Sequence, residues 1–409
     1  MGAISKTSPP RISQAAIKEL EQTLEPQARR HIAKAARLWA EIKRRGGKVV
    51  VATGSGPNLH EGVTTLLAEL VLRGLVDGVL TSSAVVGHEM AGTLERVRRV
   101  DGRRLGLPAD MLPVDGRLEA ALLTPEQLNW ISGQTEVDLD LYRRLFSAPG
   151  REIIKVAGNL AYPTGLWLER AARRLLPLAQ AAGLPLEAAA GPGCDARTML
   201  GACAIKKVPC LVSVPQLIGA GQVGLAVGDS VSLTRRSQMV AELLASADLV
   251  IESGLALAQE IHDGPFELYT GHGLWARQEG MFTFSLQGKH LVRIDLDPQL
   301  KMAWEMERKK KTVAKAIELG RPKAAGMNLA FRMEMSGFAR LPGSLPVLGD
   351  LGVVWPVLTA KACRLAGVKP GFMCYKQGTS LGEAMRSYIV EQVQPMDSDR
   401  VAKLLKFAL

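Results

Sequence analysis

Short apolar runs, each followed by small residues and then by a helix-like stretch, restrict the fold of this 409-residue chain more than any other feature. The first run, residues 48–53, is Lys-Val-Val-Val-Ala-Thr, and its β-branched side chains favour a buried strand. Residues 54–58, Gly-Ser-Gly-Pro-Asn, have the composition of a turn, and residues 59–74 have the pattern of a helix. This order is typical of parallel sheets.

The same order recurs further along the chain. Residues 76–81 are predicted to form a strand, residues 82–87 a small-residue turn and residues 88–99 a helix. Further predicted strands cover residues 184–190, 208–214, 248–252, 289–295 and 345–348. Consecutive units of this size predict an α/β fold with a doubly wound, mostly parallel sheet of the Rossmann-like kind.

Changes in composition divide the chain into expected domains. Residues 1–46 are rich in Ala, Leu, Lys, Arg and Glu and are predicted to form an N-terminal helical arm. Residues 47–370 are assigned to one α/β domain, with a mostly helical insertion over about residues 100–185. Residues 371–409 are expected to form a C-terminal helical extension.

The formal net charge of +11 permits anionic partners but does not require them. Basic clusters at residues 43–45 and 309–311 are interpreted as solvated helix ends, so nucleic acid is not predicted as a partner. Residues 208–228 carry no charge, but prolines and glycines interrupt them, which argues against a transmembrane helix. We therefore expect no membrane partner, and a small molecule as the ligand.

The five cysteines show no paired CxxC spacing, and the six histidines show no metal-ligand spacing. These patterns predict neither a disulfide framework nor a metal site. The first residues lack the apolar stretch behind a basic flank that a secretory signal has. A reducing, cytoplasmic location is expected.

In an open parallel sheet, ligands bind beyond the carboxyl ends of the strands, where helix N-termini favour anions. The predicted strand ends carry small and polar residues: Thr53, Ser55, Asn58, Thr81, Ser82, Ser83, Gly254 and Asp350. Several such loops at one edge predict a dinucleotide site, although helix capping also explains glycine or serine at any single loop. The sequence has neither a P-loop nor an uninterrupted GxGxxG after the first strand.

Several segments together carry a family resemblance. Asn58 and a helical stretch precede Thr81-Ser82-Ser83-Ala84, and residues 246–252 and 291–298 form a predicted strand pair. Residues 258–264 are Ala-Gln-Glu-Ile-His-Asp-Gly, and residues 347–358 combine a strand with a helix. In this order the segments resemble the deoxyhypusine synthase-like NAD/FAD-binding family. The resemblance implies NAD as cofactor, a transferase or oxidoreductase acting on a polyamine or related small amine, and a homo-oligomer, with a tetramer expected.

The resemblance also implies roles for individual residues. The strand-end residues named above hold NAD, including Asp350 after the closing strand. Asp195 and Asp263 hold a cationic amine, and Glu260 lies in the same matched segment as a further substrate contact. His262 beside Asp263 is the candidate proton acceptor, although a capping or packing role explains this histidine equally well. Glu89 is a further catalytic candidate, although an acidic residue at the start of a helix is also explained by the helix dipole.

The family's imine-forming lysine has no counterpart in this chain. The family carries it in a Gly-Gly-Gly-x-x-Lys-His-His run, whereas residues 228–236 contain Arg235 and Arg236 and no lysine. Arginine forms no such imine because its guanidinium stays protonated. Hydride chemistry survives this loss because it belongs to the cofactor. Two alternatives stay open: an NAD-binding enzyme whose anionic small-molecule substrate is bound by Arg235, or a non-catalytic nucleotide-binding protein.

Overall fold

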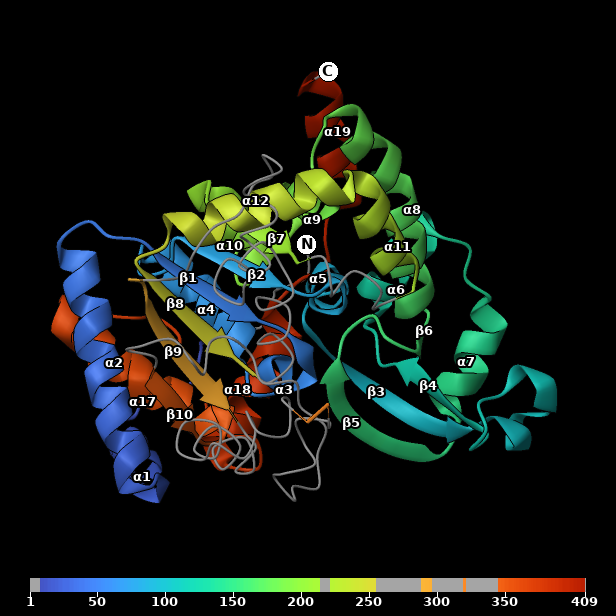
Figure 1. Cartoon of the computed structure of the whole chain (residues 1–409). Helices are drawn as coiled ribbons and strands as arrows, with labels where there is room; N and C mark the ends of the chain where they lie inside the picture. The colour runs from blue at the N-terminus through green and yellow to red at the C-terminus, as the bar shows by residue number, and fades with distance from the viewer. Residues whose placement is uncertain (1–7, 214–220, 255–287, 296–318, 321–344, 409) are drawn as a thin grey trace.

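A parallel sheet of six strands forms the centre of the molecule (Figure 1). The computed structural model describes residues 8–213, 221–254, 288–295, 319–320 and 345–408. The six strands are β1 (Val49–Thr53), β2 (Gly78–Thr81), β7 (Cys210–Val212), β8 (Leu249–Ser253), β9 (His290–Asp295) and β10 (Leu345–Leu348). Their order in the sheet is β10-β9-β8-β1-β2-β7, and every neighbouring pair is parallel.

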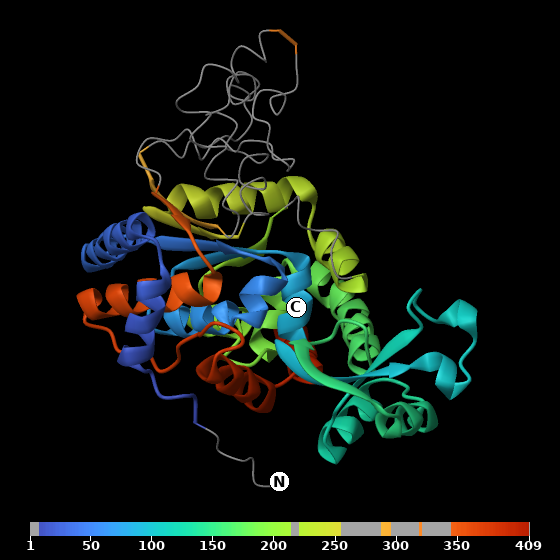
Figure 2. The same cartoon turned by 90° about the horizontal axis from the view of Figure 1, so that it is seen from below.

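This strand order confirms the predicted α/β fold with a doubly wound parallel sheet. From β1 the chain moves outward to β2 and β7, and it then returns to the other side of β1 to form β8, β9 and β10. The order is that of the dinucleotide-binding Rossmann sheets. Figure 2 shows the sheet edge-on, between α12 (Leu233–Ser246) on one face and α2 (Pro26–Arg44), α4 (Val63–Leu72) and α17 (Leu351–Ala366) on the other.

Strand β1 is apolar on both sides because both faces of the sheet are covered. Val49 and Val51 belong to the large core under α2, α4 and α17, whereas Val50 and Ala52 belong to the smaller core under α12. All five residues of β1 are buried. A continuous β-branched run, with no polar alternation, is the sequence pattern that such a strand requires.

The N-terminal helices α1 (Gln14–Thr23) and α2 pack against α17. Trp39 of α2 meets Trp355 of α17 edge-on with ring centroids 6.4 Å apart, and its indole N–H donates to the carbonyl oxygen of Leu75 (2.8 Å). The predicted helices near the N-terminus are therefore present, and they cover the sheet beside β10.

A second sheet interrupts the region that was expected to be mostly helical. Its strands are β3 (Leu94–Asp101), β4 (Arg117–Ala121), β5 (Gly150–Val156) and β6 (Ala161–Tyr162), in the order β5-β3-β4-β6. β3 is antiparallel to β4 and to β5. Figure 2 shows this sheet, with α6 (Pro125–Gln134) and α7 (Leu139–Ser147), extending away from the first sheet.

The expected helix over residues 88–99 differs from the structure because its apolar spacing fits two geometries. Leu94, Val97 and Val100 are three residues apart, as on a helix face, yet in β3 Val97 and Val100 face opposite sides of the sheet. Gly92 and Thr93 have positive φ angles of 100° and 71°, which separate α5 (Ser83–Met90) from the strand. Helix α5 itself occupies most of the expected turn at residues 82–87.

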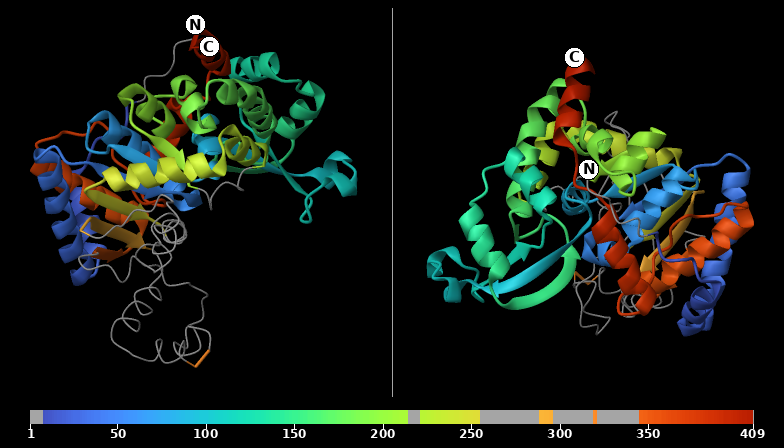
Figure 3. Two further views of the ribbon diagram at one scale, coloured as in Figure 1. Left: turned by 45° about the horizontal axis from the view of Figure 1, so that its top comes forward. Right: turned by 180° about the vertical axis from the view of Figure 1, so that it is seen from behind.

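The prediction of a strand over residues 184–190 is wrong as well. This segment contains the helix α9 (Leu186–Ala190), because its Leu-Glu-Ala-Ala-Ala sequence favours helix. The remaining helices of at least five residues in the described ranges are α3 (Ser55–His60), α8 (Thr164–Ala181), α10 (Met199–Lys206), α11 (Gln222–Ser230), α18 (Ser380–Gln392) and α19 (Ser398–Ala408). Figure 3 shows α19 from behind, against α8. Within the described ranges, no helix is both long enough and apolar enough to cross a bilayer.

Candidate functional site

The chain reverses its direction of winding between β1 and β8, and ligands of such sheets bind beyond the carboxyl ends of the two strands at this point. Thr53, the last residue of β1, pairs with Ser253, the last residue of β8. Helix α3 starts directly after β1, and Gly254 follows β8. We call residues 53–58 together with residues 253–254 the switch point.

Gly54 and Gly254 are the glycines that directly follow β1 and β8, and both are buried. Gly54 is the N-cap of α3, and no side chain in the described part of the chain caps this helix. Gly254 has a φ of +105°, which favours glycine, and its N–H donates to the carbonyl oxygen of Ile294 (3.0 Å). Among the described residues, a Cβ at Gly254 would meet only Asn58 Nδ2, at 3.6 Å.

Asn58, predicted to bind the cofactor, uses its amide to connect the two sides of the switch point. The amide nitrogen donates to the carbonyl oxygens of Gly54 and Ser253, the latter at 3.2 Å. The Ser253 hydroxyl donates to Asn58 Oδ1 (2.6 Å) and accepts from the Trp355 indole (2.8 Å). All three side chains are buried. Ser253 and Trp355 were not singled out in the sequence, because only the contact between distant segments shows their role.

Two predicted residues carry hydroxyls that fit a bound ligand. Ala52 pairs with Leu80, so Thr53 and Thr81 are neighbours at the ends of adjacent strands. Both residues are almost fully buried, and neither Oγ1 atom has a hydrogen-bond partner among the described residues. Leaving such a group unpaired costs about 1–3 kcal/mol, and the amide or hydroxyl groups of a dinucleotide would satisfy it. The orphaned hydroxyls therefore fit this class of ligand.

The other predicted cofactor residues, Ser55, Ser82 and Ser83, lie at the starts of α3 and α5. Ser55 is the first residue of α3. Ser82 caps α5 by accepting from Val85 N (3.3 Å), and Ser83 is fully buried in the first turn of α5. Their contacts with a cofactor stay a prediction.

Asp350 lies at the far edge of the sheet, after β10. Strands β8 and β9 separate β10 from β1, so at about 4.8 Å per strand the ends of β1 and β10 are roughly 14 Å apart. The Asp350 carboxylate caps α17 by accepting from Gly352 N (2.8 Å), and it lies 3.5 Å from Lys376 Nζ. These contacts give Asp350 a capping role at a distance from the switch point.

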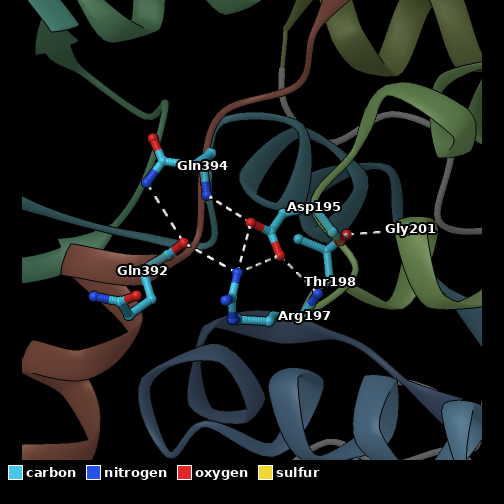
Figure 4. A network of polar contacts seen from close by, with 6 residues as sticks. All are labelled: Asp195, Arg197, Thr198, Gly201, Gln392 and Gln394. Atoms are coloured by element: carbon cyan, nitrogen blue, oxygen red, sulfur yellow. Dashed lines mark hydrogen bonds and ion pairs between the residues drawn. The ribbon is translucent and has the colours of Figure 1, made fainter. Parts of the chain in front are cut away.

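Asp195, predicted to hold a substrate amine, is engaged within the protein (Figure 4). Arg197 Nη1 lies 3.0 Å from both carboxylate oxygens, and Gln394 N donates to Oδ2 (3.2 Å). Arg197 also donates to the carbonyl oxygen of Gln392 (3.3 Å). Thr198, beside this group, caps α10 by accepting from Gly201 N (3.0 Å). The Asp195 carboxylate thus fixes the segment after α18 to the loop before α10.

Glu89 is engaged within the protein, whereas the role of Arg235 in binding an anionic substrate stays a prediction. Glu89 is 1% exposed and accepts from Met199 N (3.0 Å) and Leu200 N (3.1 Å) at the start of α10. Burial raises the pKa of Glu89 to about 8, against the opposing effect of these two hydrogen bonds. Arg235 is exposed on α12. The predicted residues Glu260, His262 and Asp263 lie outside the described residues.

Comparisons with known proteins give fold-level similarities at most. No family model matches the chain, and no curated protein matches it. Among solved structures, it is similar to AgrE in a ternary complex with ornithine and NAD+ (15% identity, 86% of this chain and 34% of that one, TM-score 0.39). It is also similar to ArgZ, an arginine dihydrolase from cyanobacteria (14% identity, 84% and 32% covered, TM-score 0.39). A third is a LOR/SDH protein from Methanococcus maripaludis S2 (14% identity, 87% and 74% covered, TM-score 0.37).

The chain therefore spans about a third of the length of AgrE and of ArgZ. None of these values reaches the level from which a shared activity follows. The assignment of the fold rests on the strand order and register of this chain.

Proposed function

We propose that the chain binds a nicotinamide dinucleotide at the switch point and is an enzyme that oxidises a small substrate. The observation that carries this proposal is the strand order β10-β9-β8-β1-β2-β7, which reverses beside two side-chain-free glycines, Gly54 and Gly254. A ligand of such a sheet binds where the winding reverses, and glycine allows its pyrophosphate to approach the backbone closely.

The residues of the switch point would divide the work of holding the cofactor. The uncapped N–H groups at the start of α3 would face the pyrophosphate, because a helix N-terminus favours an anion. The unpaired hydroxyls of Thr53 and Thr81 would bind polar groups of the ligand. When bound, NAD accepts or gives a hydride.

The protein itself would contribute buried apolar packing and fixed hydrogen bonds beside the reacting groups. Val51, Ala52 and Leu59 are fully buried, and the Asn58–Ser253–Trp355 contacts hold the two turns of the switch point together. This packing would exclude water from the sheet side of the site, which strengthens electrostatic interactions there.

The substrate that the family resemblance favours is a polyamine or a related small amine. Transfer through a lysine imine is not part of the proposal, since residues 228–236 contain no lysine. Arg236 in this stretch is fully buried, bonded to Glu187, and thus unavailable to a substrate. An anionic substrate is the second candidate, and basic side chains beside α3, described below, favour it.

Calorimetric titration with NAD, alone and then with putrescine or spermidine, tests the proposal. Gly254→Ala should weaken NAD binding at least about tenfold, because its Cβ occupies the space needed by the ligand. Gly74→Ala is the matched control, since Gly74 also has positive φ (+71°) and no atom within 4 Å of the added Cβ. Absence of NAD binding in the unaltered protein would overturn the proposal, as would equal losses in the two variants. Tighter NAD binding with the amine would support an amine substrate, and no response to it would favour the anionic one.

A further inference from the structure

Basic side chains converge where the second sheet meets the end of α3. Helices α3 and α18 both pack against β5. Gly62, just beyond α3, is so close to α18 that an added Cβ would lie 2.6 Å from Met385 Sδ. This packing brings together His60 of α3, Arg386 of α18 and Lys155 of β5, which we call the junction cluster.

Two nitrogen atoms of the junction cluster are buried without a hydrogen-bond partner among the described residues. They are His60 Nδ1 and Arg386 Nε. The Arg386 side chain is 5% exposed, and its other nitrogens are engaged: Nη2 donates to the carbonyl oxygen of Ile154 (2.6 Å), and Nη1 lies 3.5 Å from Glu383. An arginine donor buried at this depth is rarely left unpaired, because its desolvation is not compensated.

The electrostatics of the cluster also favour an added negative charge. Burial, then the positive charges of Arg386 and Lys155, lower the pKa of His60. His88 of α5 is held nearby by a hydrogen bond from Nδ1 to the carbonyl oxygen of Ala157 (2.7 Å), and burial, Lys155 and His60 lower its pKa.

The carboxylates around the cluster pair with its cations, but they leave the two orphaned nitrogen atoms without a hydrogen-bond partner among the described residues. The surrounding titratable groups are Glu61, His88, Glu95, Arg99, Glu119 and Glu383. Glu119 is shared by Lys155 and Arg99, so one carboxylate balances two cations. Burial raises the pKa of Glu95 to about 7, which leaves that group partly protonated at neutral pH.

We propose that His60, Lys155 and Arg386 form a binding site for a small oxyanion, a carboxylate or phosphate group. The oxyanion would accept hydrogen bonds from the two orphaned donors, Arg386 Nε and His60 Nδ1, while Lys155 supplies a further positive charge. The site adjoins α3, the helix that starts at the switch point. On the proposed function, the oxyanion belongs to the substrate or the cofactor of that enzyme. Only this attribution of its source depends on the proposed function.

A bound anion has a measurable effect on His60. Because an opposite charge favours the protonated imidazole, the anion should raise the pKa of His60 by about one pH unit or more. By linkage, the anion should bind about tenfold more tightly below this pKa than above it. Protonation of Glu95 acts in the same direction, since it removes a negative charge from the surroundings.

The test uses the full chain with sulfate, which keeps its charge between pH 5.5 and 8, and with acetate, against sodium chloride of matched ionic strength. The pKa of His60 is followed in 15N-histidine NMR spectra, in which His60→Gln identifies its signals. The midpoint of thermal unfolding is recorded in parallel and should rise by about 2 °C or more at saturating anion.

We expect Arg386→Gln and His60→Gln each to abolish the rise of the unfolding midpoint with sulfate or acetate. Arg143→Gln changes an exposed residue of α7 and should leave this rise intact. His60→Gln keeps the test valid if Arg386→Gln fails to fold, because His60 Nδ1 makes no bond within the described structure. Equal responses to sulfate, acetate and chloride, or an unchanged response in His60→Gln, would overturn it.

Titration with NAD in the presence and absence of sulfate separates this inference from the proposed function. Specific anion binding without NAD binding would retain the anion site and reject the proposed function. If NAD displaces the anion, the site takes a cofactor phosphate; if both bind together, it takes the substrate's anionic group.

Discussion

Strand β1 of the first sheet is buried along its whole length, whereas the first three residues of β5 in the second sheet are exposed. Ion pairs differ in the same way. Arg236 and Glu187, beside β7, are 0% exposed, while Arg98 and Glu152 of the second sheet are 22% and 46% exposed. The first sheet satisfies most of its polar groups internally and leaves only a few hydroxyls and backbone groups for a ligand. The second sheet carries more exposed charges, such as Arg98 and Glu152, and it places the less exposed Lys155 (14%) at the junction with α3.

The largest effect that this comparison predicts is on the buried ion pair. Arg236→Met should lower the free energy of unfolding by about 3–5 kcal/mol, because it leaves the buried Glu187 carboxylate without its cation. The matched change Arg143→Met removes an ion pair whose side chains are 70% and 88% exposed, and should cost less than about 1 kcal/mol. Urea unfolding of both variants provides the measurement. Similar losses would show that the two regions do not differ in this respect.

The next largest expected effect is the change of the free energy of unfolding with pH, which depends on Glu89. Its pKa in the folded chain is about 8, above the ordinary value of 4.5, so folding favours the protonated form. The resulting stabilisation is fully present below about pH 4.5 and is lost as the pH rises through about 8. From pH 5.5 to 8.5 the free energy of unfolding should therefore fall by a few kcal/mol, at about 1.4 kcal/mol for each unit of pKa difference.

Glu89→Gln should make this fall smaller, because the amide does not titrate. Urea unfolding at pH 5.5, 7.0 and 8.5 compares the two proteins. Parallel curves for the unaltered chain and the variant would contradict the assignment of the pH dependence to Glu89.

The smallest expected effect comes from removing a single buried hydroxyl, and it separates hydroxyls of the core from those that bind the ligand. Thr53→Val should raise the free energy of unfolding by about 1 kcal/mol, since it removes a buried hydroxyl without a partner in the described chain, and should weaken NAD binding. Thr64→Val in α4 is the control, because Thr64 is also buried with an orphaned hydroxyl but lies within a helix away from the strand ends. Calorimetry should show weaker NAD binding in the first variant alone. A Thr53→Val protein that binds NAD normally would remove this hydroxyl from the site.

The sequence predicted the first sheet well because buried parallel strands have a local signature. The apolar, β-branched run of β1 and the glycines after it are visible without any tertiary information. The second sheet was missed because the three-residue spacing of Leu94, Val97 and Val100 is compatible with a helix. Local pattern alone does not decide between these structures.

The candidate site was predictable only in part. Glycines and hydroxyls at the strand ends follow from the topology, and Thr53, Thr81 and Gly254 lie where the sequence placed them. Asp195 was expected to hold a cationic amine because the family resemblance implies an amine substrate. Its actual partners include Gln394, 199 positions further along the chain, and no local pattern reveals such a contact. The junction cluster likewise joins residues from three distant segments.

The contacts of the segment after α17 have a consequence for synthesis of the chain. Tyr375 Oη accepts from Ser13 N (3.0 Å), Met396 N donates to Met90 O (2.8 Å), and Asp397 N donates to Gly193 O (2.9 Å). Each contact joins a late-synthesised residue to one made hundreds of positions earlier. The ribosome therefore releases β1, β2 and the N-terminal helices well before their covering segment exists. Closure of such distant contacts is slow, so the nascent chain carries exposed apolar surface until residues 375–397 have been made.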